Sequence, residues 1–106
     1  MKESKFQKEL IKEIKSRFPG SMVLKNDPNY CQGIPDLTIL YEDRWATLEV
    51  KKSAKAKHRP NQDLYVEKMN NMSYSAFIFP ENESEVLDDM ERSFKAARKS
   101  RISKRK

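Results

Sequence analysis

The chain has 106 residues, of which 37% are hydrophobic and 36% charged, and its formal net charge is +6 at pH 7. This length allows one domain with a small core; no apolar stretch approaches the roughly 20 residues of a membrane helix, and the charged start is unlike a secretion signal. One cysteine, Cys31, and one histidine, His58, exclude an internal disulfide and a four-ligand zinc site. We therefore expect a cytoplasmic protein without zinc.

The first predicted element is an amphipathic helix over residues 3 to 18. Pro19 and Gly20 end its apolar pattern. The residues that recur at helical spacing are Phe6, Leu10, Ile11, Ile14 and Phe18. The short apolar run 21–25 then predicts a strand, and turn-forming residues follow it up to Pro35.

Two β-rich runs, 37–41 and 45–50, predict a hairpin. The residues between them, Glu42-Asp43-Arg44, indicate a three-residue loop. A basic loop over 51–59 follows, and Pro60 predicts the first turn of a helix that extends to about Asn70.

Residues 74 to 79 predict another strand, which Pro80 stops. From Glu83 onward an acidic first turn and a basic end favour a helix, whose inward stripe is Val86, Leu87, Met90 and Phe94. Residues 95–106 hold seven Lys or Arg and no acid, whereas residues 1–94 hold 15 basic and 16 acidic residues. We predict one α/β domain over 1–94, a mixed sheet flanked by helices in the order αβββαβα, and a basic C-terminal tail over 95–106.

The candidate catalytic residues lie in one segment, GIPDLTILYEDRWATLEVKK. Asp36 opens the first hairpin strand, and Glu49 and Lys51 share one face of the second because side chains alternate along a strand. A register that sets Asp36 opposite residues 49–51 brings the three charged groups together. A Glu-x-Lys pattern alone also fits an exposed cross-strand charge pair, worth less than about 1 kcal/mol.

Two adjacent carboxylates indicate a bound cation. At about 4 Å they repel each other by roughly 4 kcal/mol at an effective dielectric constant of 20, and a cation turns that repulsion into attraction. Carboxylates, a backbone carbonyl and water are the ligands that Mg²⁺ or Mn²⁺ prefers. We expect the carbonyl of Val50 to join Asp36 and Glu49 as ligands, and Lys51 to orient the attacking water or help to deprotonate it.

These residues resemble the PD-(D/E)xK nucleases, and more closely the VRR-NUC family within them. The resemblance covers about residues 3 to 79 and rests on Glu3, Gly33 to Asp36, Glu49 to Lys51, and Gln62. It implies a restriction-endonuclease-like core, a Mg²⁺ or Mn²⁺ cofactor and hydrolysis of DNA phosphodiester bonds. The compact stand-alone members, many from bacteriophages, imply a homodimer that cuts branched DNA such as four-way (Holliday) junctions, here in the bacterial host cell.

Three acids of the first helix compete for a place at the metal. Glu3 falls within the arc of the inward face, whereas Glu9 and Glu13 fall outside it. We expect Glu3 to be the ligand and Glu13 to be the reserve; alternatively, Glu3 is a helix-terminal residue that the dipole favours. Gln62 is expected to assist by bonding the lysine, a water or DNA, its alternative being an ordinary exposed glutamine.

Positive charge next to the motif predicts contacts with DNA phosphates. The basic loop directly follows the active-site strand, and the tail is a candidate DNA arm with salt-sensitive binding. The residues concerned are Lys52, Lys55, Lys57 and Arg59 in the loop and Arg98, Lys99 and Arg101 in the tail. Two other functions remain open: a non-specific or end-processing nuclease on the same fold, and a catalytically silent DNA-binding module.

Overall fold

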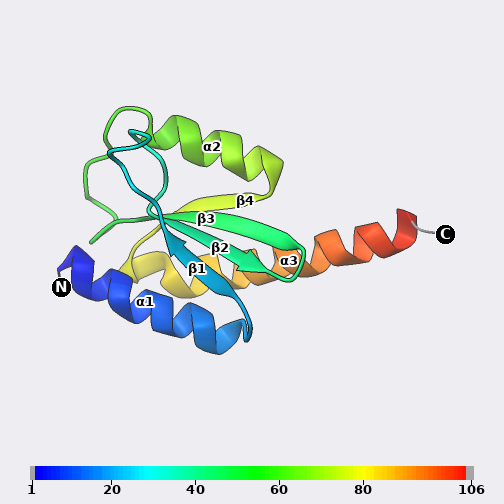
Figure 1. Ribbon diagram of the computed structural model, residues 1–106. Coiled ribbons are helices and arrows are strands. Elements are labelled where there is room, and N and C mark those ends of the chain that lie inside the picture. The colour runs from blue at the N-terminus through cyan, green and yellow to red at the C-terminus, as the bar shows by residue number, and fades with distance from the viewer. Residues whose placement is uncertain (1, 105–106) are drawn as a thin grey trace.

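A computed structural model describes residues 2–104, and the side chains of residues 2–96. Its elements follow the order expected from the sequence, αβββαβα, with one additional short 3₁₀ helix (Figure 1). The bounds are α1 (Glu3–Arg17), β1 (Met22–Lys25), β2 (Leu37–Tyr41), β3 (Arg44–Val50), α2 (Gln62–Met72), β4 (Tyr74–Ile78), η1 (Pro80–Asn82) and α3 (Glu83–Lys104). The predicted mixed sheet flanked by helices is therefore confirmed.

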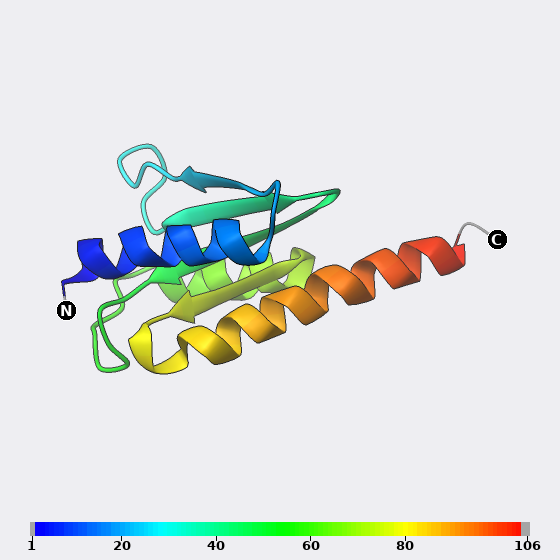
Figure 2. The same cartoon turned by 90° about the horizontal axis from the view of Figure 1, so that it is seen from below.

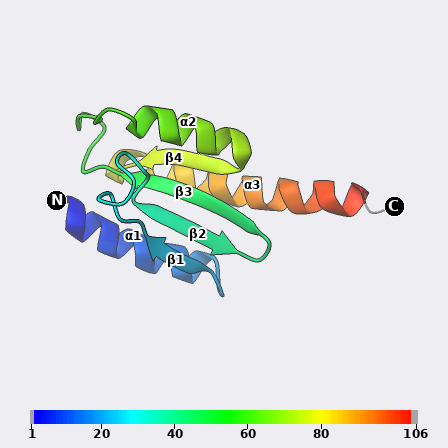
Figure 3. The ribbon, with the colours of Figure 1, turned by 45° about the horizontal axis from the view of Figure 1, so that its top comes forward.

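The four strands form one sheet in the order β1-β2-β3-β4 (Figure 3). β1 and β2 are antiparallel, as are β2 and β3, whereas β3 and β4 are parallel. The parallel pair is joined by α2, because parallel neighbours need a crossover connection and cannot be joined by a tight turn. β3 therefore lies inside the sheet, with neighbours on both sides.

The helices cover the sheet on both faces. α1 and α3 lie on one face, and α2 lies on the other (Figure 2). Arg17 at the end of α1 bonds Glu91 of α3 at 2.9 Å, which ties these two helices together. The core between them and the sheet is formed mainly by Phe6, Leu10, Ile14, Leu37, Ile39, Leu48, Val50, Ile78, Leu87 and Met90.

β3 is the most buried strand of the sheet. Its last five residues are all buried, because α1 and α3 cover one of its faces and α2 covers the other. On the α2 side the buried residues are polar: Thr47 bonds Ser75 of β4 at 2.7 Å, and Glu49 follows two residues later. The charged Glu49 therefore lies near the end of a central strand on the α2 face, and the apolar core on the opposite face is not interrupted.

The hairpin loop and the start of α2 differ from the prediction. The hairpin loop has two residues, not three, because Arg44 pairs with Tyr41, and Glu42 adopts a left-handed φ of 56° to close the turn. α2 begins at Gln62 rather than at Pro60, since Asn61 is itself left-handed, with a φ of 75°.

The C-terminal segment continues the last helix. The backbone of residues 95–104 belongs to α3, whose final turns project beyond the sheet (Figures 1 and 2). The side chains of Arg98, Lys99 and Arg101 lie outside the described residues, so their predicted contacts with DNA stay a prediction. None of the described helices is long and apolar enough to cross a membrane.

Candidate active site

The register of the β2–β3 hairpin brings the two motif carboxylates together. Leu37 pairs with Leu48, so one further step along the same antiparallel alignment sets Asp36 opposite Glu49. The charge of Asp36 acts on the pKa of Glu49, as expected for neighbouring carboxyl groups. Asp36 Oδ2 also accepts a hydrogen bond of 2.9 Å from the backbone amide of Val50. The convergence expected from the sequence is therefore present in the fold.

Glu49 is a buried acid, with only 3% of its surface exposed. Its Oε2 accepts a hydrogen bond of 2.9 Å from Gln62 Nε2. Its Oε1 is buried and has no hydrogen-bond partner in the described part of the chain. The nearby backbone amide of Asp36 lowers the pKa of Glu49. Burial, and then the charge of Asp36, raise the pKa of Glu49 to about 7, against the opposing effect of Lys51. The site therefore disfavours a second negative charge.

The pKa of Asp36 is shifted in the same direction. Burial raises the pKa of its carboxyl, while the bond from Val50 and the charge of Lys51 lower it in part. Two adjacent acids with raised pKa values fit a divalent cation, because the cation supplies positive charge that stabilises both carboxylates. One of these acids, Glu49, also has a buried oxygen without a hydrogen-bond partner among the described residues. Asp36 and Glu49 would hold the cation, together with the carbonyl of Val50.

Lys51 is buried beside this pair, with 7% of its surface exposed. Its Nζ donates hydrogen bonds to Gln62 Oε1 at 2.7 Å and to the backbone carbonyl of Lys57 at 3.1 Å. It lies 3.6 Å from Glu49 Oε2, an ion-pair distance. An ammonium has three donors, so one N–H is left over for a water or a phosphate oxygen.

Gln62 links the lysine to the acid. It is the first residue of α2, and its Oε1 accepts a second hydrogen bond, of 2.8 Å, from the amide of Arg59. These two donors fix the orientation of the amide, so its nitrogen faces Glu49. Of the partners considered for Gln62 from the sequence, the lysine is the one that the fold provides. The alternative of a solvent-exposed glutamine is wrong, because Gln62 is 9% exposed.

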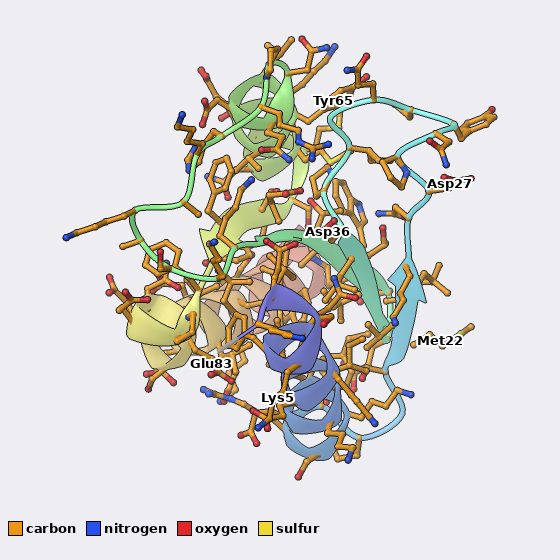
Figure 4. The ribbon with its side chains drawn as sticks, turned by 90° about the vertical axis from the view of Figure 1, so that its left-hand side faces the viewer. Lys5, Met22, Asp27, Asp36, Tyr65 and Glu83 are labelled. Carbon is orange, nitrogen blue, oxygen red and sulfur yellow. The ribbon has the colours of Figure 1, made fainter. Side chains whose placement is uncertain are left out.

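The charged cluster opens into a cleft of about 1030 Å³, lined in part by Asp36, Glu49, Lys51 and Gln62. Figure 4 looks onto this end of the molecule: Asp36 is central, with α1 below it and α2, marked by Tyr65, above it. Three of the four basic-loop residues predicted to contact DNA also line the cleft, Lys52, Lys57 and Arg59, as does His58. Lys55 is exposed but does not line it.

Glu3 lies at the cleft but not on a buried face. The expectation of burial is wrong, because Glu3 starts α1, one turn before its first buried residue, and is exposed there. It lines the cleft and its charge contributes to the raised pKa of Glu49, whereas Glu9 and Glu13 act on Glu83 instead. No group of three His, Cys, Asp or Glu side chains is close enough to hold a metal in the described part of the chain. The role of Glu3 as a metal ligand therefore stays a prediction.

The loop before the motif packs against the start of α2. Gly33 has a φ of 91°, and a Cβ at this position would lie 2.6 Å from Cβ of Asn61. Only glycine permits both this backbone and this approach. Cys31 lies 3.2 Å from the hydroxyl of Tyr65 at the same junction. The glycine of the motif thus allows the loop to pack closely against the start of α2 at the wall of the cleft.

Sequence reasoning missed the contact between Lys51 and the carbonyl of Lys57. A backbone carbonyl leaves no signal in the side-chain pattern, so only the path of the loop reveals it.

Comparison of the chain with models of known protein families and with curated proteins finds no match.

The raised pKa of Glu49 predicts a pH-dependent stability. Its value of about 7 in the folded chain lies above the ordinary 4.5, so the folded state binds a proton that the unfolded state has released. Stability without divalent metal should therefore fall as the pH rises from 4.5 to 7. The variant Glu49→Gln should lose much of this slope and be more stable than wild type at about pH 8, by on the order of 2–3 kcal/mol.

Urea unfolding across this pH range, with a chelator present, measures the effect. Glu67→Gln, a change at an exposed acid of α2, is the matched control and should keep the wild-type slope. An unchanged slope in Glu49→Gln would show that this carboxyl is ionised normally in the folded chain.

Proposed function

We propose that this chain is a metal-dependent DNA endonuclease of the PD-(D/E)xK class, similar to the VRR-NUC family, built on a restriction-endonuclease-like core. The observation that carries the proposal is the buried Lys51 ammonium, which Gln62 links to Glu49, while Glu49 lies opposite Asp36. Burying such charges is costly unless they are paired. A site for charge-stabilised hydrolysis gives a reason to keep them there.

The residues fit a Mg²⁺ or Mn²⁺ ion held by Asp36, Glu49 and the carbonyl of Val50. When bound, such an ion polarises a phosphate oxygen and lowers the pKa of water. The protein's own contribution is to bring the two carboxylates together in a buried place. Asp36 is held by the amide of Val50 and Glu49 by the amide of Gln62, so neither side chain has to reorganise before it binds.

Lys51 is proposed to act on the water and on the phosphate. Two of its N–H groups are used by Gln62 and by the carbonyl of Lys57, and these bonds fix the direction of the third. The remaining donor can hold the attacking water or a phosphate oxygen, and the positive charge offsets the negative charge that develops during attack. Gln62 is then a positioning residue, because it holds Lys51 and Glu49 in one geometry.

Lys52, Lys57 and Arg59 on the wall of the cleft support DNA as the substrate. We propose that their side chains contact phosphates on either side of the cut, and such contacts are independent of sequence. We propose branched DNA as the preferred substrate and a homodimer as the active form, since paired cuts at a junction need two sites.

Cleavage assays on matched DNA substrates test the proposal. Linear duplex, flapped and four-way DNA of one sequence should be incubated with Mg²⁺, or with a chelator as the control. We expect metal-dependent cutting that is strongest on the four-way substrate. Dominant cutting of linear duplex would instead indicate a non-specific or end-processing nuclease. Binding of DNA without any cutting in Mg²⁺ or Mn²⁺ would leave a catalytically silent module.

A further inference from the structure

His58 is held in place by two contacts from different elements. Its ring stacks on Phe77 of β4, with ring centres 4.0 Å apart and an angle of 15° between the planes. Its Nδ1 lies 2.8 Å from Asp63 Oδ1 in the first turn of α2. His58 thereby fastens the loop that follows β3 both to the sheet and to the helix.

Of the two residues that flank His58, one contacts Lys51 and the other contacts Gln62, the partner of Lys51. The carbonyl of Lys57 accepts a hydrogen bond from Lys51 Nζ at 3.1 Å. The amide of Arg59 donates to Gln62 Oε1 at 2.8 Å, and the same oxygen accepts from Lys51 Nζ at 2.7 Å. Both contacts use backbone groups, so their geometry depends on the path of the loop and not on the side chains of Lys57 and Arg59.

We propose that His58 is a positioning residue for Lys51, an inference that rests on the proposed nuclease function. By fixing the loop between residues 57 and 59, the stacked ring sets the carbonyl and the amide that hold the ammonium at the site. Misplacement of a reacting group by about 1 Å can lower a rate by about 100-fold. The loop therefore carries a structural task besides its positive charge.

The stack on Phe77 is the stronger of the two contacts. Phe77 is the register partner of Glu49 on the parallel strand, so the ring is held directly beside the charged cluster. The contact with Asp63 is open to solvent, with 35% of the His58 side chain and 72% of the Asp63 side chain exposed. Exposed ion pairs contribute little, so the flat ring is the property of His58 that matters.

Two variants of His58 distinguish positioning from chemistry at the imidazole itself. His58→Ala removes the ring and should lower kcat for DNA cleavage about 10- to 100-fold, with a smaller change in KM. His58→Phe keeps a flat ring for the stack and loses only the bond to Asp63, so its kcat should stay within about fivefold of wild type. If the imidazole donated a proton or bound a phosphate, both variants would lose activity equally, and that result would overturn the proposal.

A second readout does not depend on cleavage. Lys51 is buried and should react slowly with an amine-acetylating reagent, whereas Lys68 of α2 is exposed and serves as the internal reference in the same mass spectrum. His58→Ala should raise the relative acetylation of Lys51 at least about fivefold. Lys57→Ala, which keeps the backbone carbonyl, should leave Lys51 protected, and so should His58→Phe.

The two readouts separate the two proposals. Protection of Lys51 that is lost in His58→Ala and restored in His58→Phe supports the positioning role even if wild type cuts no DNA, a result that would defeat only the nuclease proposal. Protection that is unchanged in His58→Ala overturns the positioning role, whatever the activity of wild type.

Discussion

Replacement of Lys51 by alanine is expected to lower the rate of DNA cleavage by about 10²–10⁴-fold, the range attributed to proton transfer by a positioned group. The variant loses the buried ammonium that faces Glu49 at 3.6 Å, and with it the one donor that Gln62 and the loop leave available. DNA binding should change much less, because Lys51 is 7% exposed while the charges of the basic loop remain on the surface. Single-turnover cleavage and fluorescence anisotropy on one four-way substrate measure the two effects separately.

Loss of the ammonium leaves Glu49 without its counter-charge, so folding has to be monitored in the same samples. Lys51→Met preserves the side-chain volume and offers a second variant should the alanine form unfold. Lys68→Ala removes an exposed lysine of α2 and is the matched control, expected to cleave as wild type does. Cleavage by folded Lys51→Met at the wild-type rate would remove Lys51 from the mechanism.

Replacement of Asp36 by asparagine should weaken Mn²⁺ binding by at least about 100-fold, the upper range for loss of a residue that only supports a metal ligand. The amide oxygen of asparagine can still accept the hydrogen bond from Val50, so the hairpin should be retained. The charge of Asp36 also contributes to the raised pKa of Glu49, and that pKa should therefore move down toward its ordinary range in the variant. Isothermal titration calorimetry measures the affinity.

A proton readout accompanies this experiment. At a pH below 7, wild type should release protons when Mn²⁺ binds, because Glu49 is partly protonated without metal. Titration in buffers of different ionisation enthalpy counts these protons. Asp27→Asn, a change at an exposed acid in the loop before the motif, should bind Mn²⁺ as wild type does. Equal affinity in Asp36→Asn would exclude Asp36 as a ligand.

Much of the fold could be predicted from periodic patterns. The helical spacing of Phe6, Leu10 and Ile14 predicts the buried face of α1, and all three are almost fully buried. The alternation that separates Leu48 from Glu49 predicts that they face opposite sides of β3, as they do: Leu48 joins the core and Glu49 bonds Gln62 of α2. Such patterns work because burial selects residue type at every second or every third to fourth position.

Other features depend on backbone geometry that side chains do not encode. The sequence predicts Arg44 in the hairpin loop, whereas Arg44 pairs with Tyr41, because Glu42 adopts a left-handed conformation that its residue type does not favour. Glu3 lies within the helical arc of the core face, yet it precedes the part of α1 that the sheet covers. A helical wheel gives direction around the axis of α1 and not position along it, so it could not show that Glu3 lies outside the covered part.

The alignment of β2 with β3 has one further consequence. A slip of one residue would turn Glu49 toward α1 and α3, expose Leu48 to the cleft and take Asp36 away from its opposite neighbour. Such a mispaired chain would forfeit its apolar interior and its charged cluster at the same moment. The register that buries the apolar core is therefore the same register that assembles the charged cluster. A misregistered hairpin that is stable but lacks the cluster is not expected.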